Sequence, residues 1–136
     1  MRIVVDTNVI VSGLLSPFNP SGHIVKLLTA GKLVALYDSR IISEYKDVML
    51  RPKFDFNLEH MGALLEQIEC AGEIVACEPL SYPLPDREDE PFLEAAFSGK
   101  AACLITVNLR HYPVRVCQSI RVLSPQKFIE FYTEYS

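Results

Sequence analysis

The sequence Met1-Arg2-Ile3-Val4-Val5-Asp6-Thr7-Asn8 opens the chain and decides its fold. The apolar, β-branched residues in it follow one another without polar alternation, which is typical of a strand buried on both faces. We therefore expect residues 3–6 to form a strand that places Asp6 at its carboxyl end. Ligands and metal ions bind at that edge of open α/β sheets. The simpler alternative is that Asp6 or Asn8 only caps the helix that follows.

Segments of strand character and segments of helix character alternate along the rest of the chain. Strands are expected at 33–37, 73–75, 102–106 and 121–123, and helices at 7–16, 23–30, 39–50, 58–71, 88–98 and from 124 onward. Turn residues and prolines indicate loops at 17–22 and 78–88, and Ser39 is the expected cap of the helix that starts there. The alternation predicts a three-layer α/β/α sandwich around a mainly parallel sheet of about five strands.

Length and composition narrow the class of protein. A chain of 136 residues fits a single domain over 1–136. No apolar stretch is long enough for a transmembrane helix, and no basic leader precedes the first strand, so a cytoplasmic protein is expected. The net charge of −4 argues against tight binding of nucleic acid through charge alone. It does not exclude a nuclease, because an acidic metal site itself contributes negative charge.

The cysteines and histidines do not form a recognisable zinc motif. The four cysteines are irregularly spaced and are expected to be free and to pack as small apolar residues; they are Cys70, Cys77, Cys103 and Cys117. The three histidines lack a ligand partner three or four residues away, so zinc is not expected. The glycine patterns of dinucleotide-binding and P-loop proteins do not occur.

Three further segments carry polar groups toward the sheet edge where Asp6 is expected. Glu44 lies near the border of the apolar stripe of its helix. Residues 86–90 hold four acids in five positions, more than a helix cap requires, and crowded carboxylates repel one another unless a cation lies among them. Thr106 and Asn108 follow a buried strand. Each segment alone has a simpler explanation: a solvated glutamate, acids that favour a helix dipole, or a turn-forming asparagine.

Together and in this order, the segments resemble the PIN-domain family of small metal-dependent ribonucleases over nearly the whole chain. The resemblance is carried by the strand that ends in Asp6-Thr7-Asn8, Glu44 on a middle helix, Asp89 before a helix with Ala95 and Ala96, and the step from Thr106 to Asn108. The segments Arg51-Pro52-Lys53-Phe54 and 86–92 are similar to a subgroup that includes toxin components of toxin–antitoxin systems.

The resemblance implies that Asp6, Glu44 and Asp89 are the catalytic residues and hold Mg²⁺, with Mn²⁺ as a possible substitute. Asn108 stands where many members have a fourth aspartate, which implies weak activity or a single bound ion, and Asp86 is a candidate to compensate. The residues expected to support these acids or contact the substrate are Thr7, Asn8, Asp86, Thr106, Asn108 and Arg110.

The first functional hypothesis is an endoribonuclease that hydrolyses phosphodiester bonds of single-stranded RNA, acting as a homodimeric toxin restrained by a small antitoxin protein. The second is a PIN-like module, weakened or inactive because of Asn108, that binds RNA or a protein partner. A metal phosphatase ranks last because its usual Asp-x-Asp pair is absent, with Asn8 in the second place. The candidate substrate-binding cations are Arg40, Lys46, Arg51, Arg110 and His111.

Overall fold

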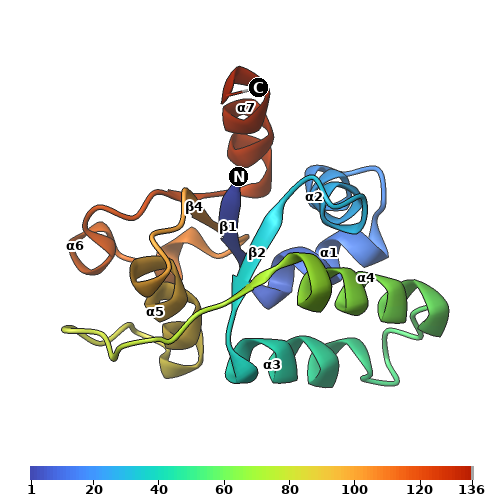
Figure 1. Ribbon diagram of the computed structural model, residues 1–136, viewed down its shortest axis with the longest axis horizontal. Helices are drawn as coiled ribbons and strands as arrows, with labels where there is room; N and C mark the ends of the chain where they lie inside the picture. The colour runs from blue at the N-terminus through green and yellow to red at the C-terminus, as the bar shows by residue number, and fades with distance from the viewer. Residues whose placement is uncertain (136) are drawn as a thin grey trace.

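A parallel five-stranded sheet forms the centre of the computed structural model, which describes residues 1–135 (Figure 1). The strand order is β3-β2-β1-β4-β5, and every neighbouring pair is parallel. The strands are β1 (Arg2–Val5), β2 (Val34–Tyr37), β3 (Glu73–Ile74), β4 (Cys103–Ile105) and β5 (Val122–Leu123). The expected α/β fold with a parallel central sheet is confirmed.

Helices fill the connections between the strands. They are α1 (Thr7–Leu15), α2 (Pro20–Thr29), α3 (Ser39–Met49), α4 (Leu58–Ala71), α5 (Glu90–Ser98), α6 (Val114–Cys117) and α7 (Pro125–Tyr135), with short 3₁₀ turns η1 (Arg87–Asp89) and η2 (Leu109–His111). Figure 1 shows α5 and α6 on one side of the sheet and α1, α2 and α4 on the other, with α7 near the N-terminus. Across residues 1–135, every helix is too short or too polar to span a lipid bilayer.

The start of α2 differs from the sequence expectation. The helix begins at Pro20 rather than at residue 23, so the segment 17–22 is only partly a loop. The side chain of Asn19 accepts a hydrogen bond of 2.8 Å from the backbone N–H of Gly22, and Pro20 occupies the first turn. An Asn cap followed by Pro is a regular helix start, and here its capping signal is stronger than the turn signal of the same residues.

The cap of α3 is also one residue away from its expected place. Asp38 is the N-cap, and its carboxylate accepts hydrogen bonds from the backbone N–H groups of Arg40 and Ile41. The prediction of a Ser39 cap was wrong, and Ser39 is the first helical residue. The short elements η2 and α6 were not predicted, because three or four residues are too few to show a helical period.

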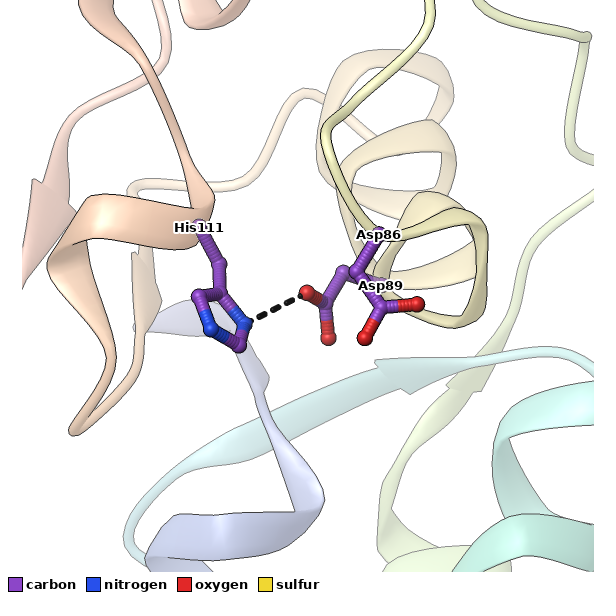
Figure 2. A group of neighbouring side chains, drawn as sticks. All are labelled: Asp86, Asp89 and His111. Carbon is purple, nitrogen blue, oxygen red and sulfur yellow. Dashed lines mark hydrogen bonds and ion pairs between the residues drawn. The ribbon is translucent and has the colours of Figure 1, made fainter.

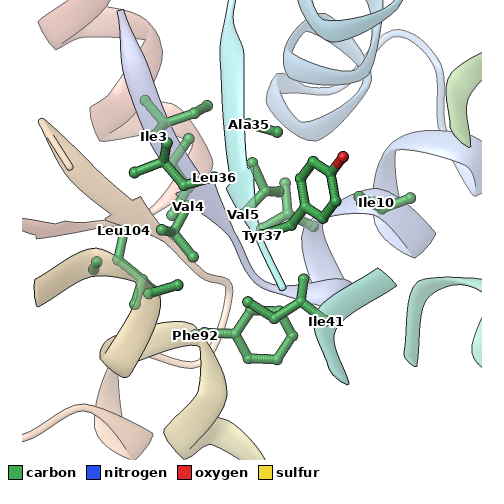
Figure 3. Packing of buried hydrophobic residues seen from close by; sticks show 14 of the residues in the cluster. Ile3, Val4, Val5, Ile10, Ala35, Leu36, Tyr37, Ile41, Phe92 and Leu104 are labelled. Atoms are coloured by element: carbon green, nitrogen blue, oxygen red, sulfur yellow. The ribbon is translucent and has the colours of Figure 1, made fainter. Parts of the chain in front are cut away.

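The core surrounds β1 on both faces. Ile3, Val4 and Val5 are at most 1% exposed, which accounts for their lack of polar alternation. Phe92 from α5 and Ile41 from α3 belong to the same buried cluster (Figure 3). Each fully buried Ile or Val side chain contributes about 1.5–3 kcal/mol relative to an exposed one, so the burial of Ile3, Val4 and Val5 contributes strongly to the stability of the sheet.

The sheet has a topological switch point at β1. The chain leaves β1 toward β2 on one side and returns later to β4 on the other. The register pairs Val5 with Ile105, and the backbone N–H of Asp6 donates to the carbonyl of Ile105 at 2.9 Å. Asp6 and Thr106 therefore leave neighbouring strands side by side, at the edge where parallel sheets bind ligands.

Candidate functional site

Asp6 is the most buried carboxylate of the described chain, with 4% of its surface exposed. Its Oδ2 accepts hydrogen bonds from the hydroxyl groups of Thr106 at 2.9 Å and Tyr112 at 3.0 Å. The side chain makes no capping bond to α1. The alternative that Asp6 only caps a helix therefore does not describe its geometry.

Burial raises the pKa of Asp6, although the hydrogen bonds from Thr106 and Tyr112 oppose that shift. Burial and the nearby negative charge of Asp6 raise the pKa of the Tyr112 hydroxyl. Tyr112 therefore stays protonated near neutral pH and acts as a donor that fixes the orientation of the Asp6 carboxylate.

Asn8 links the loop after β4 to the start of α1. Its Oδ1 accepts from the backbone N–H of Val107 at 3.2 Å, and its Nδ2 donates to Asp6 at 3.3 Å and to Thr106 at 3.4 Å. The hydroxyl oxygen of Thr106 also accepts from the backbone N–H of Asn108 at 3.0 Å. These contacts turn both ends of the Asn8 amide toward the protein, which favours a role in positioning Asp6.

Glu44 reaches the same edge from α3. It is half-buried, and its Oε2 accepts a hydrogen bond from the hydroxyl of Thr7, the first residue of α1. The next residue, Tyr45, is fully buried and donates its hydroxyl to the backbone carbonyl of Val5 at 2.5 Å. The Tyr45 contact fixes α3 at the end of β1, so Glu44 lies beside Asp6 rather than in open solvent.

Asp89 approaches the edge from the other side of the sheet, at the end of η1. Its side chain is 14% exposed, and its Oδ2 lies 2.9 Å from Nδ1 of His111 (Figure 2). Asp86 caps η1 by accepting from the backbone N–H of Glu88 at 2.9 Å. One ligand atom from each of Asp86, Asp89 and His111 lies within 4.8 Å of the others; among residues 1–135, Asp6 and Glu44 are outside this group.

The acids of this edge disfavour one another's ionisation. Burial raises the pKa of Asp89 to about 6, and the charge of Asp6 adds to that rise while His111 opposes it. Burial also raises the pKa of Glu44, and the charges of Asp6 and Glu88 add to it. A divalent cation among these carboxylates would remove the repulsion and lower all of these pKa values.

Sequence reasoning missed Tyr112, and it predicted His111 only as a cation that contacts the substrate, not as a partner of Asp89. The contact of His111 joins residues 22 apart in the chain, and the contact of Tyr112 with Asp6 joins residues 106 apart. Spacing within one helix cannot show either contact. The short turn η2 brings both side chains back over the sheet edge. The only sequence signal was their position just after Thr106 and Asn108.

The side chains of Asn108 and Arg110 take no part in the hydrogen-bond network of the site among the described residues. The side chain of Asn108 is exposed and does not cap η2, and only its backbone joins the network through Thr106. Arg110 is exposed and has no ion-pair partner within the described 135 residues. Arg110 is thus an exposed positive charge without an ion-pair partner in the described chain, and it precedes His111 in η2.

The other candidate substrate-binding cations are engaged within the protein. Arg40 pairs with Asp38 and Glu94, Lys46 pairs with Glu69, and Arg51 pairs with Asp47 at 3.6 Å. The four cysteines are free, as expected. Cys103 and Cys117 are buried, whereas Cys70 is exposed, so the expectation that it packs as a small apolar residue was wrong.

Comparison with known proteins agrees with this architecture. The chain is 24% identical over 145 aligned residues to MJ1680, an uncharacterized protein of Methanocaldococcus jannaschii, and the alignment covers 99% of this chain and 94% of that protein. The family model of the PIN domain matches residues 2–110, a range that contains β1 to β4 and the acids Asp6, Glu44, Asp86 and Asp89. The chain therefore belongs to the PIN-domain family, a membership that suggests a nuclease.

Proposed function

We propose that this protein is a metal-dependent endoribonuclease that hydrolyses phosphodiester bonds of single-stranded RNA. The observation that supports the proposal is electrostatic: the negative charge of Asp6 raises the pKa of both Glu44 and Asp89, two acids that come from separate elements. Several desolvated carboxylates held together are costly for a fold, and their cost is offset when they bind a cation.

The donor set fits a hard divalent ion, because Mg²⁺ and Mn²⁺ prefer oxygen ligands. Asp6, Glu44 and Asp89 would hold the ion directly or through water. When bound, such an ion polarises a phosphoryl oxygen and lowers the pKa of a water molecule. The protein's own part is to orient Asp6 through Thr106 and to keep the substrate phosphate near Arg110.

Asp86 and His111 are two further candidates for metal ligands. Asn108 brings no charge to the position where a fourth aspartate is usual in the family, whereas Asp86 and His111 lie close to Asp89. We propose that these two residues complete the ligand set. An imidazole ligand would disfavour Mg²⁺, which takes oxygen donors, relative to transition-metal ions such as Mn²⁺.

The test is cleavage of an end-labelled single-stranded RNA with Mg²⁺, with Mn²⁺ and with EDTA. Asp6→Asn and Asp89→Asn are expected to lower the rate at least about 100-fold, since the loss of even an outer partner of a metal ligand costs 10–100-fold. Asp47→Asn is the control, because Asp47 is an exposed aspartate on the same helix as Glu44. Acid variants that fold, judged by circular dichroism, and cut as fast as wild type would refute the assignment.

The exposed side chain of Asn108 favours a second candidate function, a weakened or inactive PIN domain that holds RNA or a protein partner. Such a protein would bind RNA without cutting it under either metal. Asn108→Asp is then expected to raise cleavage, because it restores a carboxylate next to Thr106 and His111.

The toxin role is proposed from the similarity of residues 51–54 and 86–92 to toxin-type members of the family. Induced expression in a bacterial host is expected to arrest growth, and Asp6→Asn is expected to relieve the arrest.

We also propose that residues 1–136 act as one domain and form a homodimer. Light scattering after gel filtration checks the dimer, and a single cooperative unfolding transition checks the domain.

A further inference from the structure

A surface groove of about 460 Å³ begins at the acidic edge of the sheet and extends between α1, α3 and the turn after α3. Its inner end is formed by the residues that follow β1, which are Asp6, Thr7 and Asn8. Its outer walls are mostly apolar and are formed by Val11, Ser12, Leu15, Ser16, Val48 and Phe54. The groove and the candidate site therefore share Asp6 and its two neighbours and form one continuous surface.

The fold leaves the apolar walls of this groove in contact with solvent. Leu15 is 55% exposed, and Val11, Val48 and Phe54 are each half-buried. Concave apolar surface bordered by a few polar groups is the usual form of a small-ligand site, and the volume of the groove lies in the usual range for such sites. The groove therefore fits a flat, partly apolar ligand.

Phe54 gives the outer end an aromatic ring with a positive charge over it. Its ring stacks on the ring of Phe56, with 5.2 Å between centroids and an interplanar angle of 7°. The ammonium of Lys53 lies 5.0 Å from the centroid of Phe54. An aromatic ring and a mobile ammonium group that lies over it match the two parts of a nucleotide, the base and the phosphate, when a bound base displaces the ammonium toward the phosphate.

Ser12 adds a polar group inside the groove. Its hydroxyl oxygen accepts from Nδ2 of Asn19 at 3.3 Å, and its hydrogen meets no acceptor in residues 1–135. The hydroxyl can therefore donate to the edge of a bound base.

We propose that this groove binds one unpaired base of the RNA strand, adjacent to the phosphate held at the acidic edge. This inference rests on the proposed function and names the part of the substrate that decides the preference for single strands. A base in a duplex is stacked and paired and cannot enter the groove, whereas a base in a flexible strand can contact Phe54 and the aliphatic walls. Lys53 is then placed to contact a neighbouring phosphate.

The absence of tryptophan from the chain provides a direct probe. Phe54→Trp introduces a single indole in the groove, and its fluorescence is followed while a short single-stranded RNA is added in EDTA, which prevents cleavage. Saturable quenching is expected. An RNA of the same length without bases, which keeps the phosphates, is expected to cause little quenching, as is a duplex.

Tyr135→Trp is the control, because Tyr135 is 71% exposed at the end of α7, a helix that lies away from α1 and α3 in Figure 1. Its fluorescence is expected to remain unchanged by the same RNA. Equal quenching by the RNA with and without bases would overturn the proposal, and so would quenching of the control to the same extent.

Truncation of the groove supplies a second measurement. Phe54→Ala and Leu15→Ala are each expected to weaken RNA binding by roughly 5- to 100-fold, the range that base–aromatic contacts typically provide. Val114→Ala, on α6 and 84% exposed, removes similar apolar surface elsewhere and is expected to leave binding unchanged. If the groove binds a protein segment instead, Phe54→Ala and Leu15→Ala would bind RNA like wild type, and this result would overturn the proposed base site.

The cleavage assay separates a failure of this inference from a failure of the nuclease proposal. If wild type and Phe54→Ala cut and bind single-stranded RNA equally well, the base site is wrong and the nuclease stands. If RNA quenches Phe54→Trp but no RNA is cut with Mg²⁺ or Mn²⁺, the base site stands and the hydrolytic activity is wrong.

Discussion

The guanidinium of Arg40 lies 2.8 Å from the carboxylate of Glu94 and 2.7 Å from that of Asp38. Arg40 belongs to α3, the helix of Glu44, and Glu94 belongs to α5, which begins directly after Asp89. The ion pair therefore joins the two helices that bring Glu44 and Asp89 to the sheet edge, although neither partner reaches the site itself.

Replacement of Arg40 by methionine is expected to lower the free energy of unfolding by about 1–3 kcal/mol, because Glu94 is only 8% exposed and loses its charged partner. Arg51→Met removes an exposed pair and is expected to change stability by less than about 0.5 kcal/mol. Urea unfolding at pH 7 measures both. Addition of Glu94→Gln to Arg40→Met should recover most of the loss; equal stability of the two arginine variants would contradict this prediction.

The pKa of Asp89, raised to about 6, predicts an unusual dependence of stability on pH in the metal-free protein. Because the folded state binds the Asp89 proton more tightly than the unfolded state, ionisation destabilises the fold as pH rises from about 4 through 6. Asp89→Asn is therefore expected to be more stable than wild type at pH 7.5, with the difference shrinking toward pH 4. Urea unfolding in EDTA at both pH values provides the measurement, and a difference independent of pH would contradict the prediction.

Divalent ions are expected to stabilise the folded protein. At a metal concentration 100 times the dissociation constant, binding adds about 2.7 kcal/mol, which corresponds to a rise in melting temperature of roughly 5–10 °C for a domain of this size. Asp89→Asn is expected to abolish the rise, while Asp47→Asn retains it. An equal rise in both variants would show that the ion binds elsewhere.

Pulsed electron paramagnetic resonance of the Mn²⁺-loaded protein tests whether His111 is a ligand. Modulation from a directly bound ¹⁴N nucleus is expected in wild type and is expected to disappear in His111→Gln. His60→Gln is the control, because His60 lies on α4 and not in the ligand group. Absence of the nitrogen signal in wild type would restrict the ligand set to oxygen donors.

Two helical glycines are expected to respond oppositely to alanine. A Cβ at Gly13 would lie 2.6 Å from the carbonyl oxygen of Ser21 and from a methyl group of Val25, so Gly13→Ala should cost about 1–3 kcal/mol. A Cβ at Gly62 would meet no atom within 4 Å, so Gly62→Ala should stabilise the protein by roughly 0.5–1 kcal/mol. Gly13 is therefore required by the close approach of α1 and α2, and a neutral Gly13→Ala would disprove this explanation.

The sequence allowed the fold to be predicted because its strongest signals are local. The unbroken apolar run at residues 3–5 marks a strand buried on both faces, and the alternation of strand and helix segments marks a parallel sheet. Errors occurred where two local signals overlap, as in the turn residues before α2. The ion pair of Arg40 with Glu94 could not be predicted from the sequence, because it depends on the packing of α3 against α5.

Asp6 and Asp89 could be proposed from the sequence because one follows a strand and the other precedes a helix, and parallel topology gathers such positions at one edge. Glu44 lies within α3 and was proposed from its place beside the apolar stripe and from the family resemblance. The residues that hydrogen-bond to those acids could not be predicted from the sequence. Tyr112 is buried like an ordinary core residue. Only the hydrogen bond from its hydroxyl to Asp6 distinguishes it from the other core residues. Contacts made through short irregular turns leave no periodic trace in the sequence.

The outermost strands, β3 and β5, are only two residues long. So short a border offers few unpaired amide and carbonyl groups to another chain, which protects the sheet against edge-to-edge aggregation. A continuous sheet shared between two copies is disfavoured for the same reason. Self-association of this protein is therefore expected to leave the hydrogen bonds between strands within one copy.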